Sequence, residues 1–209
     1  MSSETKSTRQ TILESAQTLV GAKGFSAVGL NEILQAAAVP KGSFYHYFTS
    51  KDAFGVVLLD TYFDSYVEGM QRLFSQAGAS HYTRLMHYWQ GWIDNHTGCT
   101  DASKCLAVKL GAEVSDLSEP MRLALQRGTS RTIDLLATAL RHGVQDGSLK
   151  LEQPPESLAR RLYALWLGTS VMGKITRTTA PFDEALGLTR QLLGHPENPA
   201  IHHDRGTGK

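Results

Sequence analysis

Cysteine is nearly absent from this 209-residue sequence, which contains only Cys99 and Cys105. Two cysteines cannot form the disulfide framework of a small secreted domain, and no secretory signal opens the chain, so a reducing, cytoplasmic location is expected. No apolar run reaches the length of about 18 residues that a membrane-spanning helix needs, so no membrane partner is expected.

A dominant charge sign is also missing, because 21 Lys and Arg residues oppose 20 Asp and Glu residues. The net charge of +1 therefore neither suggests nor excludes nucleic acid, and its distribution matters more than its total. Residues 1–51 hold five basic and three acidic residues, a net +2 that locates the slight excess at the N-terminus.

Strand-like alternation is nearly absent, whereas apolar residues recur at helical spacing along most of the chain. An all-α fold of about nine helices is expected, with one unit at 1–52 and a second at 53–194. A tail at 195–209 has little apolar content and is expected to be disordered. The expected helices cover residues 12–20, 30–37, 43–48, 51–75, 85–93, 105–115, 119–142, 156–177 and 181–194.

The third expected helix carries a run of aromatic residues. Phe44 and Phe48 are four apart and share a helix face, so they are expected to anchor this helix to the core. The side chains between them then face outward, and their hydroxyl and imidazole groups suit DNA phosphates and base edges. An aromatic surface helix that packs on another element is the alternative. The candidate DNA-binding residues are Lys41, Gly42, Ser43, Tyr45, His46, Tyr47 and Lys51.

This segment also resembles the signature of the TetR family of transcriptional regulators, over roughly residues 8–55. The resemblance implies a three-helix helix-turn-helix DNA-binding domain at 1–52 and a helical regulatory and dimerisation domain at 53–194. It implies backbone contacts from Lys41, Tyr45 and Lys51 and base contacts from Ser43 and His46. The matching residues are Gly24-Phe25, Ile33 and Val39-x-Lys41-Gly42-Ser43-x-Tyr45-x-x-Phe48-x-x-Lys51.

Three positions depart from the family pattern. Pro40 stands where a capping Ser is usual, so the third helix is expected to lack a side-chain N-cap. Gly29 stands where a phosphate-binding Thr or Ser often opens the second helix. Tyr47 replaces a frequent His, and either side chain can donate a hydrogen bond to a phosphate.

The resemblance further implies a homodimer on palindromic operator DNA. In this family the last two helices of two chains pack as a four-helix bundle, which here corresponds to residues 156–177 and 182–193. Such a dimer holds two recognition helices about one DNA turn, ~34 Å, apart. Neither an enzymatic activity nor a cofactor is expected. A thiol enzyme using Cys105 would need a positioned base and an oxyanion donor, and no motif supplies them.

Cys105 is the candidate sensing residue. Its place at a helix start beside Lys104 favours the nucleophilic thiolate, although many free cysteines are only small buried hydrophobes. Residues 39–48, 105–119 and 163–168 resemble a branch of the family that responds to N-ethylmaleimide or acrylate. That resemblance implies release from DNA by an electrophile or oxidant acting at Cys105. Noncovalent induction, for example by an unsaturated carboxylate, is the alternative.

Further candidates for the sensing site lie on the expected fifth and eighth helices. Lys174 ends an apolar helix face and either reaches solvent or points toward Cys105. Cys99 is incidental or a resolving thiol. A metal site is not expected, because His96, Cys99 and Cys105 match no compact zinc spacing. The candidate pocket walls, for each of which ordinary core is the favoured alternative, are Trp89, Trp92, Tyr163 and Trp166.

Overall fold

The computed structural model of the chain describes residues 7–97 and 105–194. Within these ranges the chain forms nine helices and no strand, as expected for the all-α fold. No helix in the described ranges is both long and apolar enough to cross a membrane. The helices are α1 (Thr8–Lys23), α2 (Leu30–Ala36), α3 (Lys41–Tyr47), α4 (Lys51–Phe74), α5 (His81–Thr97), α6 (Leu106–Leu117), α7 (Glu119–Gln145), α8 (Pro155–Thr176) and α9 (Ala180–Leu193).

Local sequence explains several of the helix ends. The side chains of Ser7 and Ser50 cap α1 and α4, accepting hydrogen bonds from backbone amides in the first turn. Gly24 follows α1 with a φ of 96°, a conformation that side-chain-bearing residues rarely adopt. The expected boundaries were right to within a few residues. For example, α6 begins after Cys105 and extends to Leu117 rather than 115, and α7 continues to Gln145 rather than 142.

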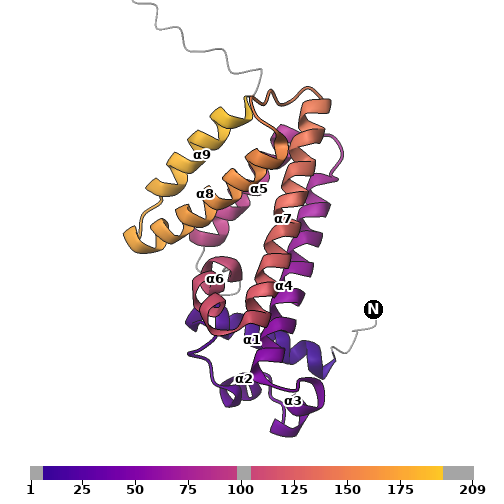
Figure 1. Cartoon of the computed structure of the whole chain (residues 1–209), viewed down its shortest axis with the longest axis vertical. Helices are drawn as coiled ribbons and strands as arrows, with labels where there is room; N and C mark the ends of the chain where they lie inside the picture. The colour runs from indigo at the N-terminus through magenta and orange to yellow at the C-terminus, as the bar shows by residue number, and fades with distance from the viewer. Residues whose placement is uncertain (1–6, 98–104, 195–209) are drawn as a thin grey trace, which may run out of the picture.

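Two long helices, α4 and α7, lie side by side and run through most of the molecule (Figure 1). The short helices α1, α2 and α3 gather at one end, around the start of α4. Helices α8 and α9 lie toward the other end with α5, and α6 lies beside α7 between α8 and the helix-turn-helix end. Helix α4 therefore belongs to both ends of the molecule.

Two hydrophobic clusters form the core. The first combines α1–α3 with the N-terminal half of α4, α6 and the start of α7. The second combines the C-terminal end of α4 with α5, the rest of α7, α8 and α9. Because the first cluster extends across the expected boundary at residue 52, the end formed by α1–α3 is packed directly on α6 and α7.

The contact between α4 and α7 is very close at one position. Gly128 on α7 packs against Phe63 on α4, and a Cβ at this glycine would lie 2.1 Å from the phenyl ring. Two ion pairs flank this contact on the surface: Arg127 with Asp60 at 3.1 Å, and Arg131 with Asp64 at 2.6 Å. The absence of a side chain at residue 128 thus sets the separation of the two long helices.

Replacing Gly128 with alanine is expected to lower the free energy of unfolding by about 1–3 kcal/mol, the usual cost of overpacking a core. Urea denaturation followed by circular dichroism would measure this. The matched control is Gly91→Ala in α5, where no atom lies within 4 Å of the added Cβ. That control should gain about 0.5–1 kcal/mol, because alanine is the better helix former. Equal stability of the two variants would contradict the close α4–α7 contact.

Candidate DNA interface and thiol site

Helix α3 presents two chemically different faces. Phe44 and Phe48 are buried and pack against Phe54 of α4, with ring centroids 5.3 and 4.9 Å from it. Tyr45 and Tyr47 are 56% and 40% exposed, which is unusual for large aromatic side chains. The expected division of this helix into a scaffold face and an outward face is therefore present.

The outward face of α3 collects most of the candidate DNA-binding residues. Lys41, Gly42 and His46 are exposed, and Ser43 is half-buried in the first turn. Helices α2 and α3 are joined by a turn in which Ala38 has a φ of 54°. A helix that projects polar and aromatic side chains from a short turn has the form needed to enter a major groove.

The start of α3 confirms the expected loss of a side-chain cap at Pro40, and the start of α2 at Gly29 lacks one as well. Pro40 is the N-cap residue of α3 and Gly29 that of α2, and neither provides a side-chain hydrogen bond to its helix. The first amides of both helices therefore remain available to an outside acceptor such as a phosphate.

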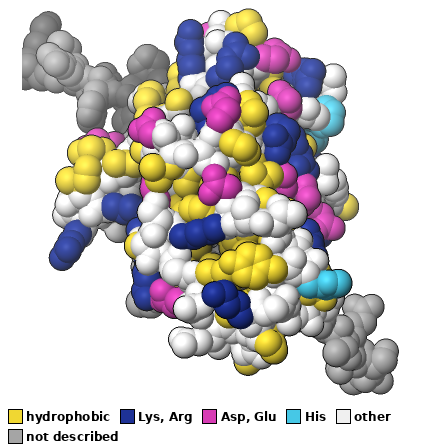
Figure 2. All heavy atoms as spheres, turned by 60° about the horizontal axis from the view of Figure 1, so that its bottom comes forward, with side chains coloured by type: hydrophobic (Ala, Val, Ile, Leu, Met, Phe, Trp, Pro, Cys, Tyr) yellow, Lys and Arg dark blue, Asp and Glu magenta, His cyan; other side chains and the backbone are white. Residues whose placement is uncertain are grey.

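Lys51 lies apart from the α3 face, at the start of α4. Its ammonium sits over the ring of Phe25, with Nζ 4.9 Å from the ring centroid. Figure 2 brings the helix-turn-helix end forward and shows Lys and Arg side chains scattered among acidic and apolar ones. The cations on this face are thus separate from one another and do not form one continuous basic patch.

Cys105 is half-buried and occupies the N-cap position of α6. It packs against the first hydrophobic cluster. The side chain of Tyr62 lies beside the cysteine side chain and interacts with it electrostatically. Tyr66 and Tyr163 also lie close enough to interact electrostatically with it. The thiol thus faces tyrosine hydroxyls from α4 and α8.

These tyrosines are neutral hydrogen-bonding groups. Burial raises the pKa of Tyr62, Tyr66 and Tyr88 well above the ordinary value, and burial also raises that of Tyr163. The hydroxyls of Tyr66 and Tyr88 share a hydrogen bond of 2.7 Å. Neutral phenols can donate to a sulfur or to an oxygen of a bound molecule, so the tyrosines of α4 and α8 give Cys105 polar, neutral neighbours.

The three candidate tryptophans form a buried stack instead of lining an open space. The indoles of Trp89 and Trp166 are stacked with centroids 4.7 Å apart, and Trp92 lies edge-on to Tyr163 at 5.9 Å. The Nε1 atoms of Trp92 and Trp166 donate to Ser170 at 2.8 Å and Thr189 at 3.0 Å. The stack therefore holds α5, α8 and α9 together, and only Tyr163 among the candidate wall residues joins the surroundings of Cys105.

Lys174 is exposed in the last turn of α8. It lines a cavity of about 330 Å³ between the end of α8 and the start of α9, together with Ser170, Gly173, Arg177, Thr178, Thr179 and Phe182. Cys99 lies outside the described residues. No group of three or more His, Cys, Asp or Glu residues in the described ranges could hold a metal ion.

Glu113, which the sequence did not suggest, connects α6 to the DNA-binding end. Its carboxylate accepts hydrogen bonds from the backbone amides of Ser26 at 2.6 Å and Phe25 at 3.2 Å. Burial acts to raise the pKa of Glu113, but the hydrogen bonds from Ser26 and Phe25 outweigh it and the pKa falls below 4.5. This junction is therefore fully formed above that value and weakens as pH falls through the lowered pKa.

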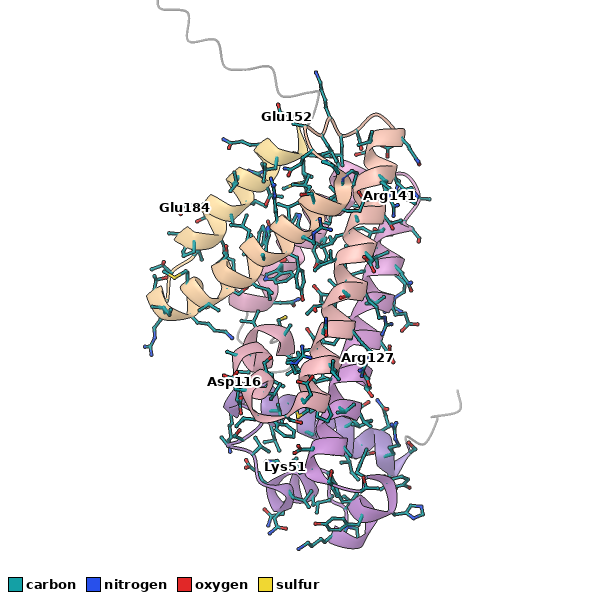
Figure 3. All side chains as sticks on the ribbon, in the orientation of Figure 1. Lys51, Asp116, Arg127, Arg141, Glu152 and Glu184 are labelled. Carbon is teal, nitrogen blue, oxygen red and sulfur yellow. The ribbon has the colours of Figure 1, made fainter. Side chains whose placement is uncertain are left out.

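Replacing Glu113 with alanine is expected to speed hydrogen exchange at the Phe25 and Ser26 amides, because their acceptor is lost. Exchange followed by NMR at pH 7 would measure this. The matched control is Asp116→Ala, which removes an exposed carboxylate from the same helix (Figure 3). Unchanged exchange in the Glu113 variant would mean that the junction is not made in solution.

Comparison with known proteins agrees with this arrangement. Residues 12–54 match bacterial regulatory proteins of the tetR family, and residues 82–188 match the tetracyclin repressor-like C-terminal domain. The HTH-type transcriptional repressor NemR of Escherichia coli is 39% identical over 189 residues, covering 90% of this chain and 95% of NemR. The transcriptional regulator AcuR of Cereibacter sphaeroides is 31% identical over 153 residues, covering 73% of this chain and 70% of AcuR.

The crystal structure of the reduced form of E. coli NemR superimposes with a TM-score of 0.83, covering 91% of this chain and 100% of that one. These relatives are transcriptional regulators and not enzymes. The chain therefore belongs to the TetR family and is a transcriptional repressor similar to NemR.

Proposed function

We propose that the chain represses transcription as a homodimer on palindromic operator DNA and leaves that DNA when an electrophile or oxidant modifies Cys105. The observation that carries this proposal is the placement of α6. The N-terminus of α6 carries the accessible thiol of Cys105. Further along the same helix, the Glu113 carboxylate accepts hydrogen bonds from the two backbone amides that follow the end of α1. The solved structure of the relative NemR is of its reduced form, which supports redox chemistry in repressors of this kind.

The DNA-binding residues of this proposal lie on the exposed face of α3 and, for Lys51, at the start of α4. Lys41, Tyr45 and Lys51 contact phosphates, whereas Ser43 and His46 reach base edges. Gly42 allows the backbone of α3 to approach the DNA, and Tyr47 donates to a further phosphate. The exposure of Tyr45 and Tyr47 supports these roles, because it leaves both side chains accessible to a phosphate or a base edge.

The reaction with a maleimide is a simple addition. The sulfur of Cys105 forms a bond to one alkene carbon, the carbon–carbon double bond becomes single, and the thiol proton ends on the neighbouring carbon. No further reactant is needed. The hydroxyl of Tyr62, which lies beside Cys105, can donate a hydrogen bond that stabilises the attacking sulfur. The adduct adds volume beside buried tyrosines, so the start of α6 must move.

This movement reaches the DNA-binding end through α6 itself. Cys105 and Glu113 are eight residues apart, which is about 12 Å along a helix. A shift of α6 displaces the Glu113 carboxylate from the Ser26 and Phe25 amides and changes the orientation of α1–α3 in each protomer. The repressor leaves the DNA because modification stabilises the orientation of α1–α3 that cannot contact both operator half-sites.

A noncovalent inducer is the second candidate. The cavity beside Lys174 and Arg177 favours it, because two cations at the end of α8 suit a carboxylate. Such a ligand would act without bond formation at Cys105, so the same thiol variant separates the two mechanisms.

Replacing Cys105 with serine is expected to leave operator affinity unchanged and to abolish release by N-ethylmaleimide in a gel-shift assay. Tyr62→Phe should retain release but slow the addition, since the hydroxyl that can donate to the sulfur is lost. Mass spectrometry after proteolysis would show the adduct on the peptide that contains Cys105 in the wild-type protein. Normal release of the serine variant would refute the thiol mechanism, whereas release only by an unsaturated carboxylate would favour the cavity beside Lys174.

The homodimer forms through α8 and α9. Four large apolar side chains on these helices are exposed in the single chain, and Ile175 is the most exposed at 69%. Burying this face against a second copy removes apolar surface from water and, as in the family, forms a four-helix bundle. The other three residues are Val171, Met172 and Leu188.

Replacing Ile175 with aspartate is expected to convert the dimer to a monomer and to weaken operator binding, because a charge would be buried at the interface. Sedimentation velocity and fluorescence anisotropy with operator DNA would measure both effects. The matched control is Val144→Asp, an exposed apolar position at the end of α7. A dimer that survives the Ile175 substitution would place the interface elsewhere.

A further inference from the structure

A crevice separates the helix-turn-helix end from α6 and α7, away from Cys105. Its volume is about 290 Å³. One wall comes from the end of α1 and the first turn of α4, and the other comes from the end of α6 and the start of α7. Figure 3 labels Lys51 and Asp116 near the two sides of this junction. The lining residues are Phe25, Ser26, Lys51, Asp52, Val114, Leu117, Ser118 and Met121.

Ser118 provides an unused hydrogen-bonding group in this crevice. The residue is 7% exposed, and among the described residues its Oγ has no hydrogen-bond partner. It occupies the N-cap position of α7, where a serine side chain normally bonds a first-turn amide, yet it makes no such bond. A buried hydroxyl without a partner costs free energy that a bound molecule could recover.

The remaining walls are mostly apolar. Phe25 and Met121 are buried and Val114 is fully enclosed, whereas Leu117 is 65% exposed beside them. The rim carries one cation and one anion, Lys51 and Asp52, so it favours neither charge sign. A cavity of about 150 Å³ with apolar walls already accommodates benzene, so this crevice is large enough for a substituted aromatic ring.

We propose that this crevice binds a small uncharged aromatic molecule with one hydroxyl group, a simple phenol. The ring lies against Phe25 and Met121, and the phenol hydroxyl bonds the free Oγ of Ser118. This site is separate from the thiol and from the cavity beside Lys174, with which it shares no lining residue.

Binding there bears directly on the DNA-binding end. Lys51 contacts the Phe25 ring from within the crevice wall, and the Glu113 carboxylate holds the amides of Phe25 and Ser26. A ring placed against Phe25 competes with the Lys51 ammonium and separates the two walls. A phenol is therefore expected to lower operator affinity without any change at Cys105, an effect that rests on the proposed DNA-binding function.

Binding itself can be tested without DNA. The full-length protein with ¹³C-labelled methionine methyl groups is titrated with p-cresol and followed by NMR. The Met121 signal is expected to shift, whereas that of Met172 on the dimer face stays constant. Toluene, which lacks the hydroxyl, should bind at least several-fold more weakly. An unmoved Met121 signal at millimolar p-cresol would overturn the proposal.

A serine pair tests the hydrogen bond. Ser118→Ala should abolish the preference for p-cresol over toluene, because the two ligands then meet the same apolar wall. Ser115→Ala is the control, since the Ser115 hydroxyl already donates to the Gly111 carbonyl at 2.6 Å and does not line the crevice. A preference for p-cresol that persists in Ser118→Ala would show that another group binds the hydroxyl and would refute the assignment.

The regulatory effect is measured separately, by operator anisotropy in the Cys105→Ser background. A several-fold loss of operator affinity with p-cresol is expected, and Ser118→Ala should remove it. If p-cresol shifts Met121 but leaves operator affinity unchanged, the regulatory role is wrong although the site exists. If the protein binds no operator even without p-cresol, the proposed function fails, independently of the Met121 result.

Discussion

The pairing of α4 with α7 is the contact on which the rest of the structure depends. Phe63 lies directly on Gly128, so the two long helices approach closely over the middle of the molecule. Since α4 begins among the DNA-binding helices and ends in the second core cluster, it forms part of both units. The orientation of the DNA-binding end is thus set by how α4 lies on α7 and by the weaker contacts around its first turns.

Those weaker contacts come mainly from α6, which packs beside the long pair. Its start holds Cys105 among tyrosines, and its third turn holds Glu113 against the end of α1. A carboxylate bonded to two amides and a cation over a ring each contribute only modestly, about 0.5–3 kcal/mol. Allosteric coupling energies are typically of this size, about 1–3 kcal/mol. The junction is therefore stable enough to hold the DNA-binding end and weak enough for a ligand to shift it.

The sequence predicted features that depend on neighbours along one helix. Helical periodicity gave the nine helices, and the spacing of Phe44 and Phe48 gave the buried side of α3. It could not show which apolar residues line a site and which fill the core. Trp89, Trp92 and Trp166 were plausible pocket walls by type and spacing, but their role depends on the packing of α5 against α8 and α9.

The features that sequence reasoning missed depend on contacts between distant parts of the chain. Tyr62 and Tyr66 are one helical turn apart on α4, yet only the fold brings them to Cys105 on α6. Glu113 accepts hydrogen bonds from backbone amides 87 and 88 residues away, and a bond to a backbone donor leaves no pattern in the side chains. Ser118 stands out only because the fold leaves its buried hydroxyl without a hydrogen-bond partner among the described residues. A thiol, a carboxylate junction and an unsatisfied hydroxyl thus all lie along α6 and its boundary with α7. All three features therefore lie on or next to the one short helix that packs against the helix-turn-helix end.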